Sequence, residues 1–197
     1  MINSVQISPS FQKRIVAKVD LPSQNGVENC SIYELDEGKK DAKRLKKQIK
    51  KQGWNFADQF IGHLKDKNNP EIRLLNVKVF SLEDENKNCL GLMKAFDFGY
   101  MKNIDYIEVN PCCRSELADG KVQNVGTALM TYLLKANQNR EFIVLHPIKN
   151  AYGFYDKMGF ERQKTIYNDN YYLTADKVSQ SIENNEQRIG SNVELLG

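Results

Sequence analysis

Gln123-Asn124-Val125-Gly126-Thr127-Ala128 is the stretch that decides the fold of this chain. It follows a predicted strand at residues 104–110 and opens a predicted helix at residues 127–137. The first N–H groups of a helix have no partner inside the helix. Together with the positive end of the helix dipole, they form a ready site for a phosphate group. We therefore expect an anion-binding turn between this strand and this helix.

The residues after this helix predict a buried strand, a helix and a hairpin. Residues 141–145 form a continuously apolar run, which is typical of a strand that is buried on both faces. A helix is expected over residues 149–158, and Gly159 is placed to end it. Residues 160–166 and 171–174 are predicted to close the sheet as a hairpin.

The residues before the turn predict two helices and an antiparallel sheet. Residues 38–52 have a narrow stripe of apolar side chains at helical spacing, and most of the other positions are lysine. Asn55 is predicted to cap a second helix. From Ile72 onward the period changes to two, and a further strand at residues 89–98 completes a hairpin.

This order of elements predicts an α+β fold in one domain with two extensions. The sheet is antiparallel in its first half and has at least one parallel crossover. We place the domain at residues 29–175, with an N-terminal extension at residues 1–28. The polar C-terminal tail at residues 176–197 is expected to be mobile, although its few apolar residues are able to dock.

Composition excludes several classes of protein. The chain has 197 residues, a formal net charge of +3 and 41% hydrophobic residues, so it is long enough to bury a core. The sequence contains no run of about 18 apolar residues, so we expect no transmembrane helix. The first residues lack the apolar segment of a secretory signal. The four cysteines have no metal-ligand spacing and are interpreted as reduced thiols of a cytoplasmic protein. We therefore expect no membrane partner and no bound metal.

A second stretch narrows the interpretation of the turn. Residues 151–160 read Ala-Tyr-Gly-Phe-Tyr-Asp-Lys-Met-Gly-Phe. Together the two stretches resemble the GNAT superfamily of acyl-CoA-dependent N-acyltransferases, and the resemblance covers about residues 30–175. The pyrophosphate motif of that family is Arg or Gln, two residues, Gly, one residue, and Gly or Ala, and its last helix often reads Ala-x-x-x-Tyr-x-x-x-Gly-Phe. The resemblance implies a mixed, mostly antiparallel twisted sheet with a splayed central strand pair and helices on both faces.

The resemblance also implies where acetyl-CoA binds. The pantetheine arm would pair with exposed backbone in the gap beside the strand at residues 104–109, like an added strand. The pyrophosphate would be held by the amides of the turn, where Gly126 lacks a Cβ and lets a phosphate approach closely. The residues implied in cofactor binding are Ile107, Val109, Gln123, Val125, Gly126, Thr127, Ala128 and Asn150, with Lys121 as a further side-chain contact.

The resemblance further implies direct transfer of an acetyl group to an amine, with no acyl-enzyme. Tyr155 matches the tyrosine that often protonates the leaving thiolate as a general acid. Backbone N–H groups near Val109 would polarise the thioester carbonyl. Glu108 is our candidate for the base that deprotonates the amine, and Asp105, His146 or a chain of waters are the alternatives.

Three departures from the family pattern concern the cofactor site. The loop at residues 112–121 is longer than usual and displaces Arg114, which resembles the arginine that commonly follows the proline there. The asparagine that the family often has before its last helix is replaced, with Asn150 nearby. The pyrophosphate motif has Gln123 in place of arginine and Asn124 where glycine is common.

The acceptor is left open between small-molecule and peptide amines. The lysine-rich helix at residues 38–52 would border the acceptor site and favour an acidic acceptor. One alternative is a toxin-like aminoacyl-tRNA acetyltransferase that uses this helix, although RNA is the less favoured partner because no aromatic residues are interleaved with the lysines. A second alternative is a non-catalytic acyl-CoA-binding or interaction module. The chain is expected to be a monomer or a homodimer.

Overall fold

The chain is built around one mixed sheet. A computed structural model describes residues 13–35, 39–54, 76–99, 101–114, 122–164 and 169–197. The sheet has the order β7-β8-β6-β5-β4-β3-β2-β1-β9. Its strands are β1 (Arg14–Ser23), β2 (Gly26–Leu35), β3 (Lys78–Asp84), β4 (Cys89–Asp97), β5 (Met101–Val109), β6 (Phe142–Leu145), β7 (Glu161–Lys164), β8 (Asp169–Thr174) and β9 (Glu194–Leu195). Neighbouring strands are antiparallel except β5 and β6, so the predicted α+β class with a mostly antiparallel sheet is confirmed.

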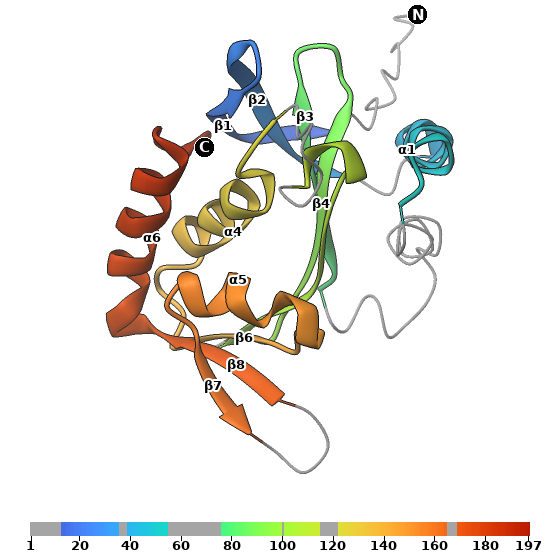
Figure 1. Cartoon of the computed structure of the whole chain (residues 1–197). Helices are drawn as coiled ribbons and strands as arrows, with labels where there is room; N and C mark the ends of the chain where they lie inside the picture. Colours follow the sequence, from blue (N-terminus) through green and yellow to red (C-terminus); the bar gives the residue numbers. More distant parts are fainter. Residues whose placement is uncertain (1–12, 36–38, 55–75, 100, 115–121, 165–168) are drawn as a thin grey trace, which may run out of the picture.

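Helices cover both faces of this sheet (Figure 1). The described helices are α1 (Lys39–Gln52), α4 (Val125–Ala136), α5 (Tyr152–Lys157) and α6 (Ala175–Ile189), with 3₁₀ turns η1 (Pro111–Cys113) and η2 (Lys149–Ala151). On one face α4, α5 and α6 enclose the larger core, which includes Leu129 and Ile182. On the other face Leu45 and Ile49 of α1 pack against Leu92 of β4. The predicted helices on both faces are therefore confirmed.

β5 and β6 are neighbours over only part of β5. Their register runs from Met101 opposite Phe142 to Ile104 opposite Leu145, where β6 ends. β5 continues to Val109 along β4 alone. A gap therefore opens beside the second half of β5, which we call the β5–β6 gap, and the predicted splayed strand pair is confirmed.

A glycine in β4 lets α4 lie close to the sheet. A Cβ on Gly91 would stand 2.6 Å from Val125 Cγ1 and 2.9 Å from Leu129 Cδ1. Both distances are too short for real contacts, so a side chain at this position would force the helix outward. Because Val125 is the first residue of α4, Gly91 sets how near the N-terminus of α4 comes to the sheet.

Both predicted extensions contribute strands to the sheet. β1 and β2 pair along their length, and the predicted boundary at residue 28 falls inside β2, so the described part of the N-terminal extension belongs to the sheet. The C-terminal tail, expected to be mobile, forms α6 and β9, and β9 pairs with β1. The polar composition of α6 concealed an apolar face at helical spacing, since Val178, Ile182 and Ile189 are buried.

The bounds of several elements also differ from those predicted. β3 begins at Lys78, which is later than expected. β5 begins at Met101 and α4 at Val125, and both of these starts are earlier than expected. The helix predicted at residues 149–158 is divided into η2 and α5. The second helix predicted from Asn55 lies outside the described residues.

Candidate functional site

The N-terminus of α4 has no capping side chain. Asn124 precedes the helix with a φ of 60°, and its side chain makes no capping hydrogen bond. This backbone conformation favours glycine but tolerates asparagine, which explains how asparagine replaces the glycine common in the family motif. The first-turn amides of Val125, Gly126 and Thr127 have no acceptor inside the helix. These amides and the positive end of the helix dipole suit a phosphate group.

Two of the predicted pyrophosphate contacts need correction. The amide of Ala128 donates to the carbonyl of Asn124 at 2.9 Å, so it belongs to the helix and is not free for a ligand. The direction in which Gly126 would carry a Cβ is filled by Phe154, whose Cζ would lie 3.2 Å away, and by Val109 at 3.4 Å. The missing side chain of Gly126 therefore allows α4, α5 and β5 to meet, and it does not leave space for a phosphate.

Both ends of the chain hold the turn that precedes α4. The amide of Gln123 donates to the carbonyl of Pro22 in β1 at 2.8 Å. The side-chain amide of Asn124 donates to the carbonyl of Arg188 in α6 at 3.1 Å. The side chain of Gln123 is exposed, so its amide group is available to a ligand at the turn.

Ile107 and Val109 turn their backbone groups away from β4. The amide of Asn110 donates to the carbonyl of Leu90 of β4 at 2.8 Å. Hydrogen-bonded pairs occur at every second residue of an antiparallel ladder, so the preceding residue of β5 that is hydrogen-bonded to β4 is Glu108. The residues between bonded positions of an antiparallel ladder point to the opposite side. On that side β6 has already ended, so the N–H groups of Ile107 and Val109 face the β5–β6 gap. This is the backbone arrangement that an added strand requires.

Arg114 connects the end of β5 with Glu108. Its Nε donates to the carbonyl of Val109 at 3.1 Å, and its Nη2 lies 3.3 Å from Glu108 Oε1. Glu108 is only 5% exposed and stands opposite Leu92 of β4. Residues opposite one another share a face of the sheet, so Glu108 lies on the face that α1 covers, whereas α4 lies on the other face.

Tyr155 lies beside the point where the β5–β6 gap opens. Its ring is 6.1 Å from the ring of Tyr171, which pairs with Leu145 at the end of β6. Phe154 and Phe160 pack edge-on against it at 5.0 and 5.9 Å. Burial raises the pKa of Tyr155 to about 12, because the phenolate would have to form away from water. The group is therefore a proton donor at neutral pH.

The remaining predicted site residues are not brought to one place. Asp105 forms an ion pair with buried Lys94. His146 is exposed directly after β6, and Asn150 is exposed in η2. Lys121 lies outside the described residues. Of the alternatives for the base, Asp105 is thus engaged by a lysine, and His146 faces solvent.

The described residues contain neither a metal-binding cluster nor a membrane-spanning helix. Within these ranges, no three histidine, cysteine, aspartate or glutamate side chains gather in a way that would hold a metal ion. Among the helices of the same ranges, none is both long enough and apolar enough to span a membrane.

Sequence reasoning missed two residues that shape the site, Gly91 and Phe154, and it identified Arg114 without its contacts. Gly91 had a signal, because an isolated glycine within a strand pattern indicates close approach of another element. Phe154 lies within residues 151–160, but the family motif specifies no residue type at its position. The bridge that Arg114 makes to Val109 and Glu108 depends on the path of the chain after β5, and no sequence pattern predicts that path.

Comparison with known proteins supports the fold and not the sequence family. No protein-family model and no curated protein sequence matches the chain. Solved structures do match it. A GNAT-family acetyltransferase from Staphylococcus aureus has a TM-score of 0.50 and 17% identity over 73% of this chain and 99% of that one. The spermidine/spermine N-acetyltransferase SpeG from Vibrio cholerae has a TM-score of 0.52 and 15% identity over 77% and 96%.

A toxin is also among the similar structures. A mutant form of the toxin AtaT, solved with the C-terminus of the antitoxin AtaR and acetyl-CoA, has a TM-score of 0.52 and 10% identity over 77% of this chain and 96% of that one. At these identities the likeness shows the fold alone. The described chain therefore has the fold of the GNAT N-acetyltransferases.

Proposed function

Because the chain has the fold of the GNAT N-acetyltransferases, we propose that it transfers an acetyl group from acetyl-CoA directly to a primary amine. One observation carries this proposal. The β5–β6 gap begins where β6 ends, beside the ring of Tyr155, and α4 has an uncapped N-terminus, so we infer that a single elongated cofactor would reach both. The free cysteines agree with a reducing compartment, and we propose that the protein acts in the cytoplasm.

The cofactor is proposed to bind with its pyrophosphate at α4 and its pantetheine arm in the gap. The amides of Val125, Gly126 and Thr127 would bind the pyrophosphate, with Gln123 adding a side-chain contact. The backbone of β5 beside the gap would pair with the pantetheine amides. The side chains of Val109 and Phe154, which meet over Gly126, would give this slot an apolar wall.

The chemistry is proposed to need an acid, a base and a group that polarises the carbonyl. The N–H of Val109 faces the gap and would stabilise the negative charge that develops on the thioester oxygen. The amine attacks the carbonyl carbon and gives up a proton to the base, the C–S bond breaks, and the thiolate of CoA takes a proton from Tyr155. The raised pKa keeps Tyr155 protonated at neutral pH, so a proton is available where the thiolate forms.

Glu108 remains our candidate for the base. It follows Ile107 and precedes Val109, and it lies on the opposite face of the sheet from α4. The helices α4, α5 and α6 occupy the first face, so an acceptor would approach from the face that Glu108 shares with α1 (Figure 1). Arg114 would hold the carboxylate of Glu108 in place.

The test is an acceptor screen in which the acetylated amine and free CoA are both measured by chromatography. Polyamines, amino acids, amino sugars, phosphorylated amines and peptides are each offered with acetyl-CoA. We expect at least one class to give product in a one-to-one ratio with CoA, and Glu108→Gln to lower this rate more than Asp105→Asn or His146→Asn does. Tight CoA binding with no product from any class would contradict the enzyme and favour a binding module.

A further inference from the structure

The charge of this protein is concentrated on one helix. α1 contains eight lysine and arginine residues and one aspartate, a net charge of +7 within 14 residues. The whole chain has a net charge of +3, so all the other residues together carry −4. Such separation of charge within one chain is a sign of a partner with the opposite charge.

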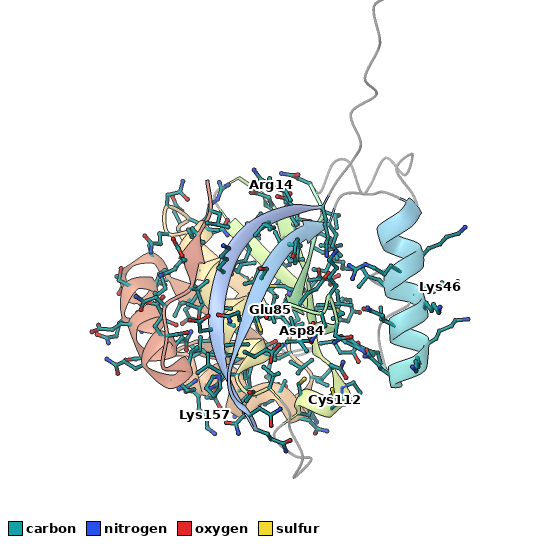
Figure 2. The ribbon with its side chains drawn as sticks, turned by 90° about the horizontal axis from the view of Figure 1, so that it is seen from above. Arg14, Lys46, Asp84, Glu85, Cys112 and Lys157 are labelled. Carbon is teal, nitrogen blue, oxygen red and sulfur yellow. The ribbon has the colours of Figure 1, made fainter. Side chains whose placement is uncertain are left out.

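The described lysine side chains of α1, from Lys43 to Lys51, lie on the side turned away from the sheet (Figure 2). Leu45 and Ile49 bury the inner side of the helix, and Arg44 on the flank is bound to Glu83 at 2.7 Å. Figure 2 shows α1 at the edge of the molecule, with Lys46 on its outer side. The exposed lysines are Lys43, Lys47, Lys50 and Lys51.

These lysines have no counter-charge within the described structure. Arg44 has carboxylate and carbonyl partners, whereas no lysine from Lys43 to Lys51 forms an ion pair in the part of the chain that is described. Lys43, Lys47 and Lys51 follow one another at four-residue spacing, and like charges at this spacing repel and weaken a helix. A helix face that only contacts water does not need lysines at this spacing, whereas a bound anion would relieve the repulsion between them.

The chemistry of this face selects the kind of anion. Its apolar residues are already buried against the sheet, so no apolar side remains that would insert into a lipid surface. The cores of protein interfaces are depleted in lysine and enriched in aromatic residues, and the sequence of α1 contains no aromatic residue. The described lysines from Lys43 to Lys51 form a row about 12 Å long, at about 1.5 Å for each residue, which suits a chain of phosphates.

We propose that the outer face of α1 binds the phosphodiester backbone of a nucleic acid without reading its sequence. The absence of aromatic residues from this helix leaves no platform for stacked bases. The contact is therefore electrostatic, and its strength depends steeply on salt. The proposal goes beyond acetyl transfer, since it assigns to α1 a ligand of its own, on the opposite face of the sheet from the N-terminus of α4 and on the face from which the acceptor would approach (Figure 1).

The experiment measures binding of a fluorescent single-stranded RNA, and of DNA with the same sequence, to the full chain without acetyl-CoA. We expect both to bind at low salt, and log Kd to rise with log salt with a slope of about 0.7 for each phosphate contact. Lys43→Gln/Lys47→Gln/Lys51→Gln should weaken binding at least tenfold and lower the slope by about 2, which is about 0.7 for each lost contact. Glutamine is a good helix former, so α1 should persist.

A matched variant removes three exposed lysines elsewhere. Lys18→Gln/Lys157→Gln/Lys164→Gln has the same net charge as the α1 variant, and we expect it to bind within about twofold of the unchanged protein. Equal weakening by the two variants would overturn the proposal, as would binding of RNA but not DNA. Binding of polyglutamate or of anionic lipid vesicles as tightly as RNA would also overturn it. Acetyl transfer to a small amine, measured on the same variants, reports separately on the proposed function.

Discussion

At the scale of the residue, Tyr155 combines a reactive group with a buried position. The phenol lies among Phe154, Phe160 and Tyr171, and burial raises its pKa to about 12. The neutral acid is the form present below the pKa. The raised pKa therefore extends to higher pH the range in which Tyr155 is protonated, and the proton is lost only in strongly alkaline solution.

We predict that Tyr155→Phe lowers kcat by about 10²-fold, while the dissociation constant for acetyl-CoA changes by less than about twofold, because the ring still packs. Since the pKa is raised, the ratio of the two rates should stay constant between about pH 6 and pH 10. Rate profiles of both proteins over this range would check it. Equal rates throughout, or a defect that disappears below pH 9 or so, would refute the acid assignment.

Sequence could predict the identity of site residues better than their contacts. The motif predicted Gly126, and the structure gives it a different task from the one expected, because its Cβ position faces Phe154. Ala128 was assigned a ligand contact that the helix itself uses. Both errors have one cause, since a motif specifies spacing along the chain but not the direction in which each group points.

At the scale of the element, the position of α4 depends on a strand that no motif includes. β4 accommodates the first turn of α4 only where it has no side chain, at Gly91. The order of helices and strands followed from periodicity, whereas the splayed pair was implied by the family resemblance and is observed where β6 ends at Leu145. The close approach of α4 to β4 followed from neither, because it joins residues more than thirty positions apart.

We predict that Gly91→Ala lowers the free energy of unfolding by about 1–3 kcal/mol and weakens acetyl-CoA binding, because the added methyl group displaces the N-terminus of α4. Denaturant unfolding and calorimetry would measure the two effects. The second change Val125→Ala should restore part of both, since it removes the contacted Cγ1. Gly153→Ala is the matched control, because nothing lies within 4 Å of its Cβ position. Similar losses from the two glycine variants would show that close approach is not the cause.

At the scale of the whole molecule, the ends of the chain support the centre of the site. Pro22 of β1 and Arg188 of α6 both accept hydrogen bonds from the turn before α4. Sequence reasoning treated both regions as extensions, because the first shows only weak alternation of apolar and polar residues and the second is polar in composition. Their role depends on contacts between distant parts of the chain, which composition does not reveal.

We predict that Ile189→Ala lowers the free energy of unfolding by about 2–5 kcal/mol, because this residue of α6 is 1% exposed. Leu195→Ala, at 43% exposure in β9, should change it by about 0.5 kcal/mol or less. Denaturant unfolding of both variants would check this. A loss of unfolding free energy in Ile189→Ala no larger than that in Leu195→Ala would contradict the claim that α6 is part of the folded core.

The central claim is that the N-terminus of α4 and the free edge of β5 together hold acetyl-CoA. Titration of the ¹⁵N-labelled protein with acetyl-CoA, followed through its backbone amide resonances, tests this claim most directly. We expect the largest shifts at the amides of Val125, Gly126 and Thr127, with further shifts at Ile107 and Val109. An absence of shifts at the α4 amides, or shifts centred on another part of the molecule, would contradict the account.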